Sequence, residues 1–237
     1  MGRIWLLVVW FGCSTSNPRP VEGTPHDAAG PVYEGRPIAA TCSHLGADWL
    51  DRPDREAREQ PERVLDMLAI RSGSTVADVG AGTGYFTVRL SKRVGPTGSV
   101  LATELQPEML RLLDARLSRE RINNVRLIRG TEHQVNLPAR CCDLVVMVDV
   151  YHELVDPPGV MSGIRRALTE TGRLVLVEYR AEDPSVPIKP EHKMTLSQIK
   201  SELVRLGFAF VESREELPDQ RVVVFTRDDA FVHSGRR

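Results

Sequence analysis

A glycine-rich run in the first half of the chain has the residue types and the spacing of a ligand-binding loop. The run DVGAGTGY (residues 78–85) places Asp78 two residues before the first of three glycines, at positions 80, 82 and 84. Glycines at such a point let the backbone turn tightly and let a ligand approach the main chain and the N-terminus of a following helix. A dinucleotide-binding fingerprint would need its third glycine where this chain has Tyr85. The loop therefore predicts a ligand site and disfavours a nicotinamide dinucleotide.

A second candidate group is an acid at the end of the next predicted strand. Glu104 closes the segment SVLATE (residues 99–104) and lies 24 residues after Gly80. A carboxylate at this point can accept two hydrogen bonds from the hydroxyls of a ribose. The alternative is a solvated acid at a strand end, which the glycine loop before it makes the weaker interpretation.

The elements around these residues predict a doubly wound α/β fold. Short apolar or β-branched runs alternate with segments of helical periodicity, which is typical of βαβ units and a parallel sheet. The closing pair of strands is separated only by a short polar turn, which predicts one antiparallel strand near the C-terminus. We therefore expect a Rossmann-like, mostly parallel sheet of seven strands whose carboxyl edge holds the ligand. The expected strands lie at 74–79, 99–104, 125–128, 143–150, 173–179, 208–213 and 221–226.

Composition excludes several other classes of function. The chain has 237 residues, with 31 basic and 32 acidic side chains, so no general basic field is available to bind nucleic acid. Its four cysteines include no CxxC pair, and no His, Cys or Asp cluster has metal-ligand spacing, so we predict no metal. At least one of the adjacent Cys141 and Cys142 is interpreted as a buried small hydrophobe.

The N-terminus differs from the rest of the chain. Residues 1–13 have one early positive charge and an apolar stretch that ends at Cys13, a layout that resembles a bacterial lipoprotein signal. Residues 14–45 are read as a flexible linker, rich in Pro and Gly in their first part, followed by a domain over residues 46–227 and a tail over 228–237. We expect membrane anchoring in the bacterial cell envelope, with a cytoplasmic location as the alternative.

Four segments of the chain resemble the class I S-adenosylmethionine-dependent methyltransferases. They are VADVGAGTGYFTVRL (76–90), LATELQPEML (101–110), CDLVVMVDVYHEL (142–154) and TGRLVLVEYR (171–180), and the resemblance extends over roughly residues 46–227. More narrowly, VDVYHE and VPIKPEHKM resemble a group of bacterial methyltransferases without an assigned substrate. Glu104 stands where Asp is commoner in the family, which keeps the bidentate chemistry and moves the carboxylate by one methylene.

The resemblance implies roles for the candidate residues in binding S-adenosylmethionine. Asp78 would hold the methionine amino group, and Glu104 would hold the ribose diol. The loop residues would make room for the aminoacyl arm, and residues after the second and third strands would meet the adenine. The cofactor-binding set is Asp78, Gly80, Ala81, Gly82, Gly84, Tyr85, Glu104, Leu105, Gln106, Thr131, Glu132 and Asp149.

The segment DVYHE (residues 149–153) follows the fourth predicted strand, where the resemblance places the reactive methyl group. His152 is predicted to act as a base near neutral pH, with Tyr151 shaping the pocket and Asp149 beside the methyl group. The alternative is that His152 caps a helix or packs. The loop containing His192 is a further candidate wall of the acceptor pocket. The segment is not the (D/N)PPY of many methylases of nucleobases or glutamine amides.

The prediction is therefore an enzyme that moves a methyl group from S-adenosylmethionine to a small acceptor by in-line displacement, with a lipophilic acceptor as one option. The neutral leaving group makes positioning the first requirement. A tethered, non-catalytic cofactor-binding module is the first alternative, and a nicotinamide-dependent oxidoreductase is the second. No nucleic-acid partner is expected, and the oligomeric state is left open.

Overall fold

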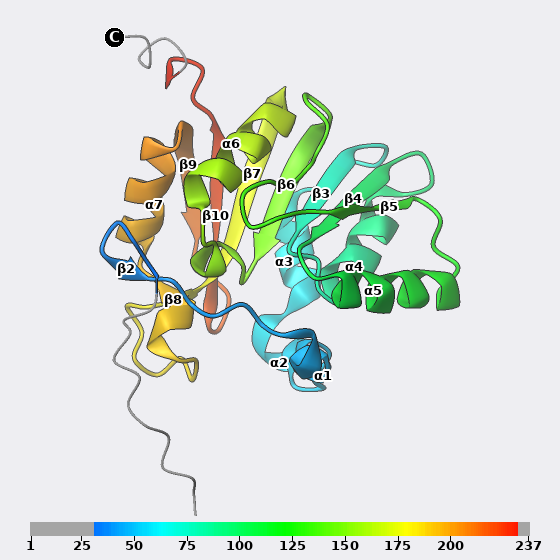
Figure 1. The fold of residues 1–237 in the computed structure, drawn as a ribbon, viewed down its shortest axis with the longest axis horizontal. Helices are drawn as coiled ribbons and strands as arrows, with labels where there is room; N and C mark the ends of the chain where they lie inside the picture. The colour runs from blue at the N-terminus through cyan, green and yellow to red at the C-terminus, as the bar shows by residue number, and fades with distance from the viewer. Residues whose placement is uncertain (1–30, 232–237) are drawn as a thin grey trace, which may run out of the picture.

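A single twisted sheet with helices on both faces forms the body of the computed structural model, which describes residues 31–231 (Figure 1). Seven strands follow the order β5-β4-β3-β6-β7-β10-β9, and the two-residue strand β8 pairs with the end of β7 as an eighth. The strands of this sheet are β3 (Thr75–Val79), β4 (Ser99–Glu104), β5 (Val125–Arg129), β6 (Cys142–Val148), β7 (Leu168–Arg180), β8 (Lys193–Met194), β9 (Phe208–Arg214) and β10 (Gln220–Arg227).

The directions of the strands confirm the predicted fold class. Strands β5, β4, β3, β6 and β7 pair in parallel, and β10 is antiparallel to both of its neighbours, β7 and β9. The predicted count of seven strands omits only β8. Since the strand order reverses between β3 and β6, the crevice for a ligand lies at the carboxyl ends of these strands.

Successive side chains along a strand point to opposite faces of the sheet, and both faces are covered by helices. Val76 contacts the apolar cluster of α3 and α4, whereas its neighbour Ala77 contacts the cluster of α6 and α7 on the other face. Proline begins three of these helices, where its missing N–H has no helical partner to lose. The long helices are α3 (Pro61–Leu68), α4 (Tyr85–Val94), α5 (Pro107–Arg119), α6 (Pro157–Ala167) and α7 (Leu196–Arg205).

Residues 36–46, here called the crossing segment, run along the carboxyl edge of the sheet (blue in Figure 1). They begin with β2 (Arg36–Pro37), which pairs with β1 (Val32–Tyr33) in a hairpin, and they lead into the short helices α1 (Ala47–Leu50) and α2 (Arg55–Glu59). Arg36 is buried, and its Nε and Nη2 donate to the two carboxylate oxygens of Glu202 in α7, both at 3.1 Å. Its Nη1 also donates to the carbonyl oxygen of His152 at 3.0 Å.

The crossing segment corrects the predicted domain boundary. Residues up to 45 are predicted to be a flexible linker, but the backbone N–H of Ala39 bonds to the carbonyl of His152, and Gln106 bonds to both Cys42 and His44. The prediction from composition was wrong because individual polar contacts hold this segment. Such contacts need no regular spacing of apolar residues, so the sequence shows no pattern there. The lipoprotein-like residues 1–13, with Cys13, lie outside the described residues. None of the helices within residues 31–231 has the length and apolar character needed to span a bilayer.

We predict that the buried pair Arg36–Glu202 contributes far more stability than the exposed pair Arg205–Glu34 beside it. Replacing Arg36 by Met leaves the Glu202 carboxylate buried with an unpaired charge, so the free energy of unfolding should fall by about 3–5 kcal/mol. Arg205→Met is the matched control. It should lower the free energy of unfolding by less than about 1 kcal/mol because both members of the Arg205–Glu34 pair are exposed to solvent. Urea unfolding of the full chain measures both. Equal small losses would mean that the crossing segment is not part of the folded domain.

Candidate functional site

A cavity of about 620 Å³ lies at the carboxyl edge of the sheet. This volume is in the range of sites for cofactors and small ligands. Its walls come from the loops after β3, β4, β5 and β6, from the crossing segment and from the loop before β8. The structure thus brings together most residues predicted from the sequence, namely Asp78, Gly80, Ala81, Gly82, Tyr85, Glu104, Leu105, Gln106, Thr131, Glu132, Asp149 and His152.

Two of the three loop glycines open space for a ligand. Gly80 and Gly82 have φ values of 74° and 54°, and they line the cavity. A Cβ atom on Gly80 would lie 2.5 Å from Cγ2 of Val150, and one on Gly82 would lie 3.0 Å from Cδ1 of Leu50. Side chains at these positions would therefore close the passage between the loop and the opposite wall.

Gly84 has a different role from the one predicted. It does not line the cavity, and a Cβ atom there would lie 2.2 Å from Cδ1 of the buried Leu113. With a φ of 88° it precedes the first residue of α4, so it serves the turn and the packing of α5 rather than ligand contact. The neighbouring Thr83 does line the cavity, and its buried hydroxyl has no hydrogen-bond partner among the described residues.

Asp78 is a buried carboxylate at the end of β3. Its side chain is 3% exposed and accepts a hydrogen bond of 2.6 Å from the hydroxyl of Thr87 in α4. Burial raises the pKa of Asp78 to about 6, and the nearby carboxylate of Glu104 contributes in the same direction. A cationic group bound here would restore the ionised form.

Glu104 is fixed at the end of β4 by two backbone groups. One carboxylate oxygen accepts from the N–H of Gly82 at 2.9 Å, and the other accepts from the N–H of Gln106 at 2.8 Å. Each oxygen keeps a second lone pair for a ligand hydroxyl. The carboxylate is therefore held against the glycine loop in an orientation that can receive a diol.

The residues assigned to adenine contact line the cavity, but the polar groups of Gln106 and Thr131 bind the backbone of the protein itself. The side-chain amide of Gln106 binds the crossing segment, donating to the carbonyl of Cys42 at 2.7 Å and accepting from the N–H of His44 at 2.9 Å. The hydroxyl of Thr131 accepts from two backbone N–H groups of its own loop. Leu105, Thr131 and Glu132 all line the cavity, and Thr131 and Glu132 are exposed.

Asp149 lies on the opposite wall, directly after β6. It has a φ of 54°, and both of its carboxylate oxygens accept from the side-chain amide of Gln220 in β10, at 2.9 and 2.7 Å. Burial raises the pKa of Asp149 well above its usual range, and the carboxylates of Glu59 and Glu178 add to the effect. The group is thus a second acid of the cavity that a positive charge would stabilise.

His152 lines the cavity within a buried polar cluster. Its Nδ1 lies 2.6 Å from Oε2 of Glu178, and its Nε2 lies 3.1 Å from Nδ1 of His192. Burial lowers the pKa of His152, but the carboxylate and hydrogen bond of Glu178 outweigh it, so the pKa is raised overall. The pKa of His192 is lowered by burial and by His152, and burial raises that of the adjacent Glu153 to about 7.

Tyr151 is not at the cavity, which corrects its predicted catalytic role. Its side chain is fully buried, and its hydroxyl donates to Oε2 of Glu202 at 3.0 Å, on the side of α7 and Arg36. Residues 151–153 form one turn of 3-10 helix, in which successive side chains point about 120° apart. His152 and Glu153 can therefore face the cavity while Tyr151 faces the core.

Arg55 is a residue of the cavity that gave no signal in the sequence. Arg55 of α2 lies over the ring of Tyr85, with its guanidinium carbon 4.1 Å from the centroid, and its Nε donates to Glu59 at 2.6 Å. Tyr179 donates to the same Glu59 at 3.2 Å. In the sequence Arg55 and Glu59 are only an i, i+4 pair of a charged helix, whereas in the structure Arg55 lines the cavity and Glu59, which does not, binds Arg55 and Tyr179.

The strand order and the ligand cavity at the switch point define a class I methyltransferase domain, and comparisons with known proteins agree. Residues 70–214 match the methyltransferase domain family, so the chain belongs to that family. A SAM-dependent methyltransferase from Aquifex aeolicus superposes with a TM-score of 0.74 at 25% identity, covering 78% of this chain and 98% of that one. The predicted S-adenosylmethionine cofactor agrees with these findings.

Two curated relatives are similar over part of their length. The ubiquinone/menaquinone biosynthesis C-methyltransferase of Pasteurella multocida is 28% identical over 117 residues, 49% of this chain and 44% of that protein. The demethylmenaquinone methyltransferase of Staphylococcus aureus is 27% identical over 155 residues, 65% of this chain and 62% of that protein. The chain thus spans about half the length of the curated relatives it matches.

We predict that Asp78→Asn stabilises the ligand-free protein. The pKa of this carboxyl is about 6 when folded against 3.8 ordinarily, so its ionisation opposes folding as the pH rises from 4 to 6. The amide removes that cost and still accepts the hydrogen bond of Thr87. The free energy of unfolding at pH 7 should rise by about 2–3 kcal/mol.

The pH dependence and a matched variant check this assignment. The gain should vanish below about pH 4, where the carboxyl is protonated in both the folded and the unfolded state. Asp114→Asn, an exposed position on α5, should change the stability by no more than a few tenths of a kcal/mol. Urea unfolding at pH 4 and pH 7 measures both variants. An equal gain at both pH values would show that ionisation of Asp78 is not the cause.

Proposed function

We propose that this protein transfers a methyl group from S-adenosylmethionine to a small lipophilic acceptor that carries a ring hydroxyl, of the hydroquinone type. One observation carries the proposal. A single cavity joins the glycine loop and Glu104 on one side to an aliphatic wall with a histidine pair on the other. The names of the curated relatives, which refer to quinones, support the class of acceptor.

The cofactor half of the cavity fits S-adenosylmethionine. Asp78 would bind the cationic amino group, and Glu104 would bind the ribose diol. The unpartnered hydroxyl of Thr83 offers a further contact, and the space that a Cβ on Gly80 or Gly82 would fill is left free for the aminoacyl arm. When bound, the cofactor supplies an electrophilic methyl group on a sulfonium.

Charge favours the cofactor over its product. The carboxylates of Asp78 and Asp149 line the cavity, and burial raises the pKa of both, so each gains from a nearby positive charge. The sulfonium carries such a charge, and the thioether left after transfer does not. Since the amino group at Asp78 is common to donor and product, the preference for the methyl donor would come from Asp149.

The acceptor half combines apolar walls with a few polar atoms. Leu154, Val155, Val160, Pro187 and Ile188 line it, between the polar side chains of His152, Glu153 and His192. Aliphatic walls would exclude water from a flat ring, and the polar groups would hold its hydroxyl in one orientation. In-line transfer depends on such positioning, since the leaving group is neutral and needs no proton.

Attachment of the protein to a membrane is part of this proposal. The lipoprotein-like residues 1–13 motivate it, and a quinol-like acceptor would be drawn from the lipid phase. A cytoplasmic enzyme with a smaller acceptor is the alternative.

We predict that S-adenosylmethionine binds the full chain and that Glu104→Ala weakens this binding about 10- to 100-fold. The variant loses the hydrogen bonds that the ribose hydroxyls donate to a charged acceptor, worth about 1.5–3 kcal/mol. Glu108→Ala, four residues later and outside the cavity, is the matched control and should bind as the unaltered chain does. Calorimetric titration with S-adenosylmethionine, and separately with NADH, measures this. Binding of NADH alone would favour an oxidoreductase.

Turnover tests the acceptor class separately. With S-adenosylmethionine labelled in its methyl group, we expect label in the organic phase when a naphthohydroquinone is supplied, and none when the oxidised quinone is supplied. Binding of the cofactor without transfer to any quinol would contradict the proposed acceptor and favour a non-catalytic module.

A further inference from the structure

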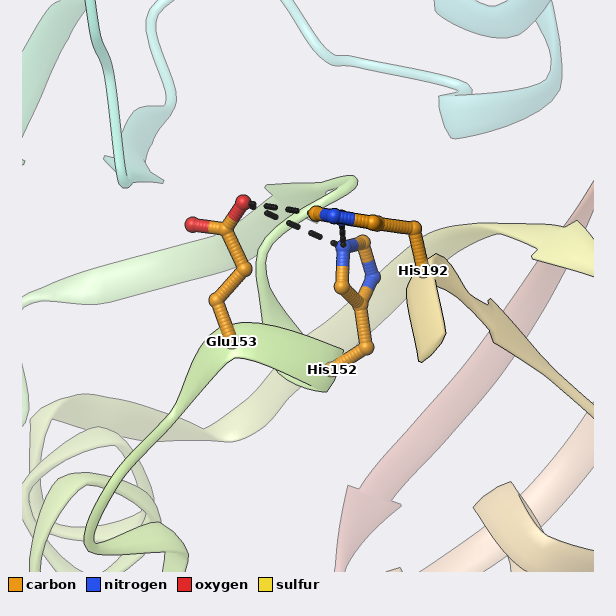
Figure 2. Close-up of side chains that lie close together, drawn as sticks. All are labelled: His152, Glu153 and His192. Carbon is orange, nitrogen blue, oxygen red and sulfur yellow. Dashed lines mark hydrogen bonds and ion pairs between the residues drawn. The ribbon is translucent and has the colours of Figure 1, made fainter. Parts of the chain in front are cut away.

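Three side chains with metal-ligating atoms meet on the acceptor wall of the cavity. His152 and Glu153 come from the 3-10 turn after β6, and His192 ends the 3-10 turn before β8. Their ligand atoms all lie within 4.8 Å of one another, and Figure 2 shows the three side chains turned toward a common point. The prediction of no metal relied on spacing along the sequence, which does not reveal ligands 40 residues apart.

The state of His152 suits a metal ligand. Its Nδ1 faces Oε2 of Glu178 at 2.6 Å, and a carboxylate acceptor there places the ring proton on Nδ1. The lone pair of Nε2 then faces His192 and the cavity. Glu178 is itself fully buried and is fixed by a second bond from the N–H of Tyr151 at 2.9 Å. A carboxylate behind a histidine is the arrangement that orients imidazole ligands in metal sites.

The distances fit a small tetrahedral cation. Nε2 of His152 and Nδ1 of His192 are 3.1 Å apart, and Zn–N bonds of about 2.0–2.1 Å place two ligating nitrogens about 3.3 Å apart. Oε1 of Glu153 is 4.0 Å from each nitrogen, so it must move inward by roughly 0.7 Å to ligate, which rotation of its side chain permits. All three residues line the cavity, so a fourth position would face the ligand space.

A hydrogen bond between His152 and His192 explains why the two rings touch, but it does not explain why the carboxylate of Glu153 lies beside them. Glu153 is beyond hydrogen-bond distance of both nitrogens, yet its carboxylate is 14% exposed and lies equally far from each. Glu178 adds a second acid behind His152. Two imidazoles between two carboxylates are better matched by a dication than by a single shared proton.

We propose that His152, Glu153 and His192 form a binding site for one divalent cation of the zinc type, with an open position toward the acceptor. His152 then acts as a ligand instead of the base predicted from the sequence. This inference rests on the proposed function in one respect: the open position would take the hydroxyl oxygen of the acceptor. Coordination lowers the pKa of a bound hydroxyl, and the proton is released to solvent.

The test uses Zn²⁺ alone, added to the full chain after treatment with a chelator, without S-adenosylmethionine or acceptor. Competition with a chromophoric chelator should show one equivalent bound with micromolar or tighter affinity. His192→Ala and Glu153→Gln should each weaken binding by at least ~10- to 100-fold, and Glu178→Gln by about the same factor through His152. His133→Ala, an exposed histidine outside the cluster, is the matched control and should leave the affinity unchanged.

Two further measurements keep the outcomes distinct. Replacing zinc by Co²⁺ should give the spectrum of a tetrahedral site with nitrogen and oxygen ligands. A sulfur-to-cobalt charge-transfer band would show that a cysteine holds the ion and would overturn the proposal, as would unaltered zinc affinity in His192→Ala or no binding in the unaltered chain. Calorimetric titration of His192→Ala with S-adenosylmethionine should match the unaltered chain, which verifies the fold. Failure of zinc binding with intact cofactor binding would refute the metal site alone.

Discussion

The carboxylate of Glu178 fixes the wall of the cavity that carries His152. It lies near the end of β7 with no exposed surface, and its two oxygens accept from the N–H of Tyr151 and from the ring of His152. Burying a charge is costly unless it is hydrogen-bonded, so this group can persist only with both partners in place. The turn after β6 is therefore tied to β7 by a contact that also sets the orientation of the His152 ring.

A second set of contacts holds the same turn from the other side. The carbonyl of His152 accepts from Nη1 of Arg36 and from the backbone N–H of Ala39. Arg36 is in turn paired with Glu202, which also accepts the hydroxyl of Tyr151. Tyr151 thus contributes to the site by holding the turn of residues 151–153 in place through its hydrogen bond to Glu202. Positioning of this kind is what in-line methyl transfer requires, because the chemistry itself needs little else from the protein.

The sequence was sufficient for the parts of the molecule that depend on local patterns. Alternation between apolar strands and amphipathic helices predicts the sheet, and the spacing of Asp78, Gly80, Gly82 and Glu104 predicts residues that the structure brings together at one cavity. Gly84 and Tyr151 were assigned to the site wrongly because spacing does not reveal on which side of a turn a side chain lies. His192 was predicted only as part of a loop that could line the pocket. Its approach to His152 depends on the pairing of β8 with the end of β7, which the local sequence does not show.

The crossing segment shows why composition alone misplaced the start of the domain. Its fixed points are Arg36 at one end and the bonds of Gln106 to Cys42 and His44 at the other, and neither leaves a periodic pattern. Between these points it touches the His152 turn on the acceptor side, and beyond them Leu50 and Arg55 complete the wall near the glycine loop. The crossing segment, together with the helices α1 and α2 that follow it, therefore covers both halves of the cavity. Because it contacts the turn after β6 and the loop after β4, any movement that opens one half must loosen the contacts that shape the other.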